Sequence, residues 1–150
     1  MTDEGKKVVL VVAGTISLAR TLRDALKRGD FPCEVVLVHD RLGALDYLLG
    51  RSTQAGRGNH LIPSVILLDL SLPDAEGSEL LRELRTYERT KLLPIVAFSS
   101  SEQKQETNSI YTSGANSYIS QRAGFEPFAE VLQRVARYWC DINEPPPMVA

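Results

Sequence analysis

The chain has 150 residues, of which 43% are hydrophobic and 24% charged, and its formal net charge is −2. This length and balance predict one soluble domain with a real core, and the small net charge gives no sign of a nucleic-acid-binding surface. The first apolar run, residues 8–13, is too short for a signal peptide or a membrane span. Cys33 and Cys140 have no metal-binding or redox spacing, so we expect reduced thiols and a cytoplasmic protein.

Strands and helices are predicted to alternate from the start of the chain. Residues 8–13 predict a first strand, and apolar residues at helical spacing follow between Ser17, the candidate N-cap, and Gly29. Residues 34–39 predict a second strand. Leucines 42, 45, 48 and 49 mark a second helix, which Gly50 ends, and the polar residues 51–60 predict a surface loop.

The central stretch, residues 64–73, reads SVILLDLSLP. Its apolar run predicts a strand that is buried on both faces. A carboxylate inside such a strand costs several kcal/mol to desolvate unless it is paired, so we expect Asp69 at the carboxyl end of the strand. Ligand sites of open parallel sheets lie outside those carboxyl ends, which makes Asp69 the first candidate for function.

The second half continues the alternation. Residues 79–87 predict a third helix, and residues 95–98 a fourth strand that runs into serines. The polar stretch 102–113 predicts a weakly held helix with Ile110 and Tyr111 as anchors, ended by Gly114. Residues 116–120 predict a fifth strand. The last helix, 125–139, has the strongest apolar stripe, and prolines 145–147 prevent it from continuing.

Five strands alternating with five helices predict an α/β fold, a doubly wound five-stranded parallel sheet with helices on both faces. The expected strand order is the flavodoxin-like 2-1-3-4-5. In that order Ala13 and Gly14 lie beside Asp69 at the switch point, and Ser99 and Gln121 follow the neighbouring strands.

The central strand with its Asp, the SLPDAEG that follows, the serines after PIVAF and the GANSYI before the last helix resemble the receiver domain of bacterial two-component response regulators. The long loop before the third strand, the aromatic pair near the end of the last helix and the proline run resemble the single-domain regulators that accompany phytochrome-type histidine kinases. The resemblance implies a receiver domain at residues 7–140, a short tail at 1–6 and a Pro-rich tail at 141–150.

The resemblance also implies roles for particular residues. Asp69 matches the phosphoacceptor aspartate, and Ser99 matches the hydroxyl residue that contacts the phosphoryl group. Tyr118 matches the switch aromatic, and Ser71 matches the position whose backbone carbonyl binds the metal beside Asp69. The residues alone also allow structural alternatives: Asp69 as a polar residue at a strand end, Ser99 as an N-cap or turn serine, and Tyr118 as half-buried aromatic packing.

Two requirements of the family are not met. Ala13 and Gly14 stand where the family has an acidic pair that helps to bind Mg²⁺, and Gln121 and Arg122 stand where it has Lys-Pro. Mg²⁺ sites use one or two carboxylates together with phosphate oxygens, and a lysine contact at about 4 Å is worth on the order of 4 kcal/mol at an effective dielectric of 20. We therefore expect weak Mg²⁺ binding, no required cofactor, and a trans Gln121–Arg122 bond, since a cis bond without proline costs about 2.5–4 kcal/mol.

The sequence therefore predicts an atypical response regulator, not an enzyme, that acts in phosphorelay signalling by protein–protein interaction with weak or absent phosphorylation at Asp69. One alternative is a conventional regulator that a phytochrome-type histidine kinase phosphorylates on Asp69. Another is a small phosphatase-like hydrolase, which Ser71 disfavours because such enzymes use a second Asp there. Expected partners are a histidine kinase or another signalling protein and a second copy, through the fourth and fifth helices and the tail, but no nucleic acid or membrane.

Overall fold

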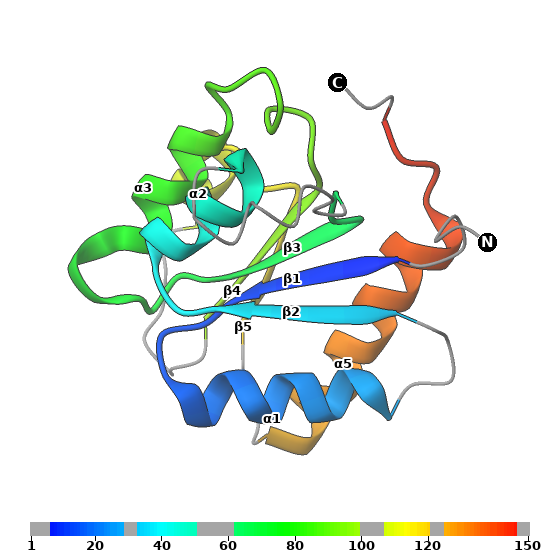
Figure 1. Ribbon diagram of the computed structural model, residues 1–150. Helices are drawn as coiled ribbons and strands as arrows, with labels where there is room; N and C mark the ends of the chain where they lie inside the picture. The colour runs from blue at the N-terminus through cyan, green and yellow to red at the C-terminus, as the bar shows by residue number, and fades with distance from the viewer. Residues whose placement is uncertain (1–6, 29–32, 51–61, 100–106, 121–124, 147–150) are drawn as a thin grey trace.

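A computed structural model of the chain describes residues 7–28, 33–50, 62–99, 107–120 and 125–146 (Figure 1). Five parallel strands form one sheet: β1 (Val8–Val12), β2 (Glu34–Val38), β3 (Val65–Asp69), β4 (Ile95–Ser99) and β5 (Ser117–Ser120). Their order is β2-β1-β3-β4-β5, which confirms the predicted doubly wound topology. All five strands therefore present their carboxyl ends at one edge of the sheet.

Helices cover both faces of the sheet. The described helices are α1 (Ile16–Lys27), α2 (Arg41–Leu49), α3 (Glu76–Leu84), α4 (Thr107–Ser113) and α5 (Phe125–Arg137). In Figure 1, α1 and α5 lie below the sheet, and α2 and α3 lie above it. Ile110 of α4 packs in the same core cluster as the buried leucines of α2 and α3, so α4 belongs to their face.

Alternation along the strands divides the core between the two faces. Leu10 and Val12 point to the cluster under α2 and α3, whereas Val9 and Val11 point to the cluster under α1 and α5. Side chains of a strand alternate between its faces, so β1, β3 and β4, covered on both, are apolar almost throughout. Their burial explains why the sequence identified these strands from short apolar runs.

The ends of the first two helices lie close to the predicted positions. Thr15, and not Ser17, is the N-cap of α1: its backbone is extended and its side-chain oxygen accepts a hydrogen bond from the Leu18 N–H at 3.1 Å. Gly50 ends α2 in the left-handed conformation (φ 69°), as predicted. Leu42, expected on the apolar face of α2, is instead 63% exposed. The expected end of α1 at Gly29 lies outside the described residues.

Helix α3 begins and ends three residues before the predicted range of 79–87. A 3-10 turn, Pro73–Ala75, leads directly into it, and Asp74 and Ala75 both have φ of 59°. This left-handed backbone is unfavourable for non-glycine residues by about 1–2 kcal/mol each, so no residue pattern indicates it. The pair of left-handed residues turns the chain sharply and places the start of α3 against the end of β3.

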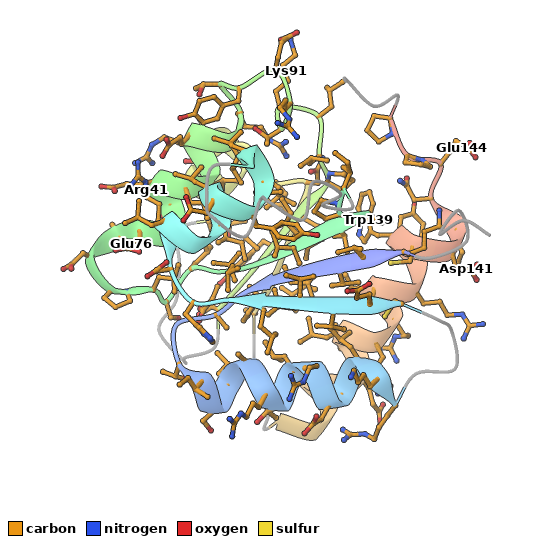
Figure 2. All side chains as sticks on the ribbon, in the orientation of Figure 1. Arg41, Glu76, Lys91, Trp139, Asp141 and Glu144 are labelled. Atoms are coloured by element: carbon orange, nitrogen blue, oxygen red, sulfur yellow. The ribbon has the colours of Figure 1, made fainter. Side chains whose placement is uncertain are left out.

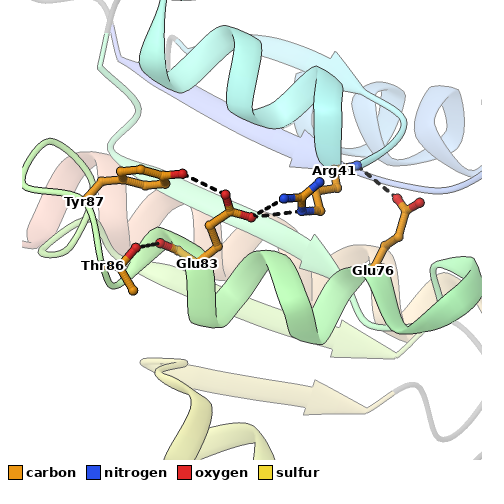
Figure 3. Close-up of polar contacts among 5 residues, drawn as sticks. All are labelled: Arg41, Glu76, Glu83, Thr86 and Tyr87. Atoms are coloured by element: carbon orange, nitrogen blue, oxygen red, sulfur yellow. Dashed lines mark hydrogen bonds and ion pairs between the residues drawn. The ribbon is translucent and has the colours of Figure 1, made fainter.

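Polar contacts join α2 to α3, the two helices that lie above the sheet in Figure 1 (Figure 3). The Arg41 side chain contacts Glu83 Oε1 through Nε at 2.9 Å and Nη2 at 2.7 Å, and the Arg41 backbone N–H donates to Glu76. The Tyr87 hydroxyl donates to the other Glu83 oxygen at 2.7 Å. These contacts hold the amino end of α2 against α3.

The last helix changes geometry at its end. After Arg137 the chain continues as a π-helical turn, Tyr138–Ile142. The α-helical part of α5 therefore ends two residues before the predicted end at residue 139. The Tyr138 ring meets the Trp139 ring edge-on, with centroids 5.1 Å apart. Figure 2 shows Trp139 beside the amino ends of the strands, away from the edge that carries Asp69. Tyr138, expected on the apolar face of the last helix, is instead 44% exposed, and Ile142 is largely exposed.

Both cysteines are free thiols. Burial raises the pKa of the Cys140 thiol to about 11, with a further contribution from nearby Cys33. Cys33 lies just before β2 and is half-buried, and burial raises the pKa of its thiol as well. Within the described part of the chain, no helix has both the length and the apolar character needed to cross a membrane.

Candidate functional site

Asp69 lies at the carboxyl end of β3, as the sequence predicted, and is only 3% exposed. Its Oδ1 accepts a hydrogen bond from the Ser71 N–H at 2.8 Å, and its Oδ2 accepts a longer one from the Gly14 N–H at 3.5 Å. The carboxylate is therefore held between the β1–α1 loop and the β3–α3 loop. Such contacts offset part of the cost of burying a charged group.

A hollow of about 340 Å³ opens over the Asp69 carboxylate. It is lined by Gly14, Thr15, Leu18, Asp69, Ser71 and Pro73. Of the lining residues that the structure describes, Asp69 is the one charged residue, and the Thr15 oxygen already caps α1. The hollow therefore combines one carboxylate with hydroxyl groups and the apolar walls formed by Leu18 and Pro73.

The two substituted positions after β1 lie beside this hollow. Ala13 is fully buried in the cluster under α1 and α5, and its N–H donates to the Val38 carbonyl at 3.1 Å. Gly14 lines the hollow but has no side chain. A Cβ added to Gly14 would lie 3.1 Å from the Cδ2 of Leu72 and 3.9 Å from the Cδ of Pro73. A longer side chain at position 14 therefore requires Leu72 to move slightly.

Ser99 and Tyr118 occupy the neighbouring strands. Asp69 pairs with Phe98 in the sheet, so Ser99, the fully buried last residue of β4, lies at the same edge as Asp69. Tyr118 pairs with Ala97 and packs, half-buried, against the cluster under α2 and α3. Gln121 and Arg122, with the predicted trans bond between them, lie outside the described residues.

Mg²⁺ is the ion that the resemblance implies for this hollow. Magnesium takes near-octahedral oxygen ligands, with one or two carboxylates from the protein. Asp69 is the one carboxylate among the described lining residues, and both of its oxygens already accept backbone hydrogen bonds. In the described ranges, no group of three or more His, Cys, Asp or Glu residues could hold a metal ion. These residues do not fit a strong Mg²⁺ site.

One residue that shapes the site, Gly77, was missed by the sequence reasoning. It is buried in the first turn of α3, and an added Cβ would lie 2.7 Å from the backbone oxygen of Asp69 and 3.1 Å from the Cα of Leu70. Real Cβ atoms do not approach this closely, so only glycine lets α3 begin this near to Asp69. The glycine in the sequence PDAEG was the one available signal for this close packing. The sequence does not show that the backbone of Asp69 lies against it.

A doubly wound sheet with a buried aspartate at the end of its third strand, facing the β1–α1 loop, has the receiver-like architecture that the resemblance implies, with the candidate site at the topological switch point. The comparison with protein families agrees, because the response regulator receiver domain matches residues 9–133. The chain therefore belongs to the response regulator receiver domain family, as the resemblance predicted.

Known proteins of the same kind cover most of the chain. Response regulator Rcp1 of Synechocystis sp. is 27% identical over 143 residues, covering 94% of this chain and 95% of Rcp1. The phosphorylated cyanobacterial phytochrome response regulator RcpA has a TM-score of 0.81 at 27% identity, covering 95% of this chain and 99% of RcpA. The bacteriophytochrome response regulator RtBRR is 34% identical with a TM-score of 0.68, covering 94% of this chain and 84% of RtBRR. The chain is thus similar to response regulators of phytochrome systems.

Proposed function

We propose that this chain is an atypical response regulator that signals by protein–protein interaction, with Mg²⁺-dependent phosphorylation of Asp69 weak or absent. Membership of the receiver family supports the phosphorelay role. The observation that supports the atypical chemistry is that Asp69 is the single charged residue among the described residues that line its hollow. We also propose residues 7–140 as the receiver unit, since the family matches 9–133 and Cys140 still packs in the core.

The chemistry of phosphorylation explains why the missing charges matter. One oxygen of the Asp69 carboxylate would attack the phosphorus of a donor, forming an acyl phosphate while the donor's leaving group departs. Catalysis of this step depends on positive groups that neutralise the phosphoryl oxygens. Among the described residues, the lining offers the carboxylate, hydroxyl groups and backbone N–H groups, and none of these residues is a lysine or arginine. We therefore expect Asp69 to be a slow nucleophile.

A direct test is incubation of the protein with Mg²⁺ and a small phosphodonor, followed by intact mass measurement. The proposal expects little addition of phosphate, and the Asp69→Asn variant provides the background level. Efficient, Mg²⁺-dependent addition of one phosphate that Asp69→Asn abolishes would contradict it.

The second candidate is a conventional regulator that a partner histidine kinase phosphorylates on Asp69. The phosphorylated structure of RcpA and the Mn²⁺-bound structure of Rcp1, the latter 25% identical with a TM-score of 0.79, favour this alternative. Kinase-driven labelling that disappears in Asp69→Asn would establish it. Labelling that is unchanged in Asp69→Asn would exclude Asp69 as the acceptor.

We further propose that the chain forms a homodimer through α4, α5 and the residues after α5. Large apolar side chains of these segments are exposed: Tyr111 (46%), Tyr138 (44%) and Ile142 (67%). Light scattering at tens of micromolar tests this proposal, with Ile142→Asp expected to give monomer. Leu42→Asp is the matched control, because Leu42 is equally exposed (63%) on α2 and should leave the dimer intact. A wild-type protein that is only monomeric would rule the dimer out.

A further inference from the structure

The side chain of Arg85, just after α3, connects several segments that are distant in sequence. Its Nε donates to the Gly114 carbonyl at 2.9 Å, and its Nη2 donates to the Asn116 side-chain oxygen at 2.9 Å. Its Nη1 donates to three carbonyls of the loop between α3 and β4: Thr90 (3.4 Å), Lys91 (2.8 Å) and Leu93 (2.8 Å). A guanidinium group has five N–H donors in a fixed plane, so it can hold several oxygens in one arrangement.

These contacts join the α3–β4 loop to the turn between α4 and β5. Gly114 ends α4 with φ of 123°, and an added Cβ would lie 2.7 Å from the Cγ of Arg85. Asn116 is bound twice to the start of β4, because its N–H donates to the Ile95 carbonyl at 2.9 Å and its side-chain oxygen accepts from the Ile95 N–H at 2.8 Å. Arg85 thus packs on Gly114 with its aliphatic stem and bonds the turn with its head group.

In the part of the chain that the structure describes, helix α4 has few buried apolar side chains to hold it. It has seven residues, of which only Ile110 is buried. A segment with few buried apolar contacts opens locally at low free energy unless other interactions restrain it. The Arg85 contacts are such a restraint, because they act on the residues where α4 ends and β5 begins.

We propose that Arg85 is a latch that fixes the end of α4 and the start of β5 to the α3–β4 loop, and so restrains local opening of residues 110–118. The latch is independent of whether Asp69 accepts a phosphate, and it therefore goes beyond the proposed function. It also assigns a positioning role to a residue far from the hollow over Asp69.

The test is residue-resolved hydrogen exchange of the full chain with Arg85→Met. The amides of Gly114, Ala115 and Asn116, which donate to Tyr111, Ile110 and Ile95, should exchange at least tenfold faster than in the wild type. Arg82→Met is the charge-matched control. Its exposed side chain makes no hydrogen bond or ion pair with any part of the chain that the structure describes, so these three amides should be unaffected.

A second control separates local opening from general loss of stability. Gly77→Ala destabilises the domain without touching the latch, so it should speed the slowest amides of the sheet and leave the three turn amides unchanged. Turn amides that respond equally to Gly77→Ala and Arg85→Met open only with the whole domain, and this result would overturn the proposal. So would turn amides that do not respond to Arg85→Met.

A pair of Asn116 variants keeps the proposal testable if Arg85→Met does not fold. Asn116→Asp retains an oxygen that can accept from Arg85 and from the Ile95 N–H, so protection of Gly114 and Ala115 should remain within about threefold of the wild type. Asn116→Ala removes that oxygen and should lose protection at least tenfold. Equal protection in the two variants would contradict the latch.

Discussion

The close approach of Gly77 to the end of β3 gives a quantitative prediction for Gly77→Ala. The added methyl group would lie 2.7 Å from the Asp69 backbone oxygen and 3.1 Å from the Leu70 Cα. Both neighbours belong to the backbone of a buried segment, so neither can rotate away as a side chain would. The start of α3 or the end of β3 must shift instead.

The magnitude follows from two opposing terms. Overpacking of a well-packed interior costs about 1–3 kcal/mol, and backbone neighbours place this site in the upper part of that range. Alanine is favoured over glycine in a helix by up to about 1 kcal/mol. The net expectation is a loss of about 1–2 kcal/mol in the free energy of unfolding, with a melting temperature lower by roughly 2–8 °C.

Urea denaturation measures this loss, with an unchanged slope showing that the two states keep their compactness. Gly43→Ala is the matched control, since Gly43 also lies in a first helical turn but its nearest neighbour is the Asp40 side-chain oxygen at 3.2 Å. That variant should be within about 0.5 kcal/mol of the wild type. If Gly77→Ala is as stable as Gly43→Ala, the explanation of Gly77 by steric exclusion is wrong.

Three further predictions concern other parts of the molecule. Gly14→Asp adds a second carboxylate to the hollow and should raise Mg²⁺ affinity at least tenfold (about 1.4 kcal/mol) in calorimetric titration; unchanged affinity would refute the one-carboxylate explanation. Because its pKa is raised to about 11, the Cys140 thiol should react with iodoacetamide at pH 8 only after unfolding in urea, and rapid labelling of the folded protein would contradict its burial. Glu83→Ala removes the acceptor of Arg41 and Tyr87 and should lower the free energy of unfolding by about 1–2 kcal/mol in urea denaturation, whereas an effect near zero would show that these part-buried contacts contribute nothing.

The strands and their order could be predicted from the sequence because burial on both faces leaves short apolar runs with few alternatives. The same reasoning located Asp69, since a carboxylate is tolerated only where such a strand ends. Helix starts were harder to predict. Thr15 and Ser17 can both cap a helix, and serine is the somewhat better capping residue. Thr15 is nevertheless the N-cap of α1, because the position of the cap depends on where the chain leaves β1.

The contacts that could not be predicted join residues far apart in the chain. The start of α3 depends on left-handed backbone at Asp74 and Ala75, a conformation that aspartate tolerates but alanine disfavours. In the sequence, Arg85 is an ordinary charged residue near the end of the predicted helix 79–87. In the structure, its side chain donates hydrogen bonds to Gly114 and Asn116. Such partners are set by how the elements pack and not by local pattern.

The position of β1 inside the sheet has a consequence for how the protein folds. Val9 pairs with Val35 on one side and with Val65 on the other, so β1 stays open along one edge until β3 has been synthesised. Pairing between strands so distant in sequence carries a large loop-closure entropy and slows folding. A nascent chain that ends before β3 would expose an apolar strand edge, the kind of surface that promotes misassembly. The strand that ends in Asp69 therefore also completes the folding of the amino-terminal half.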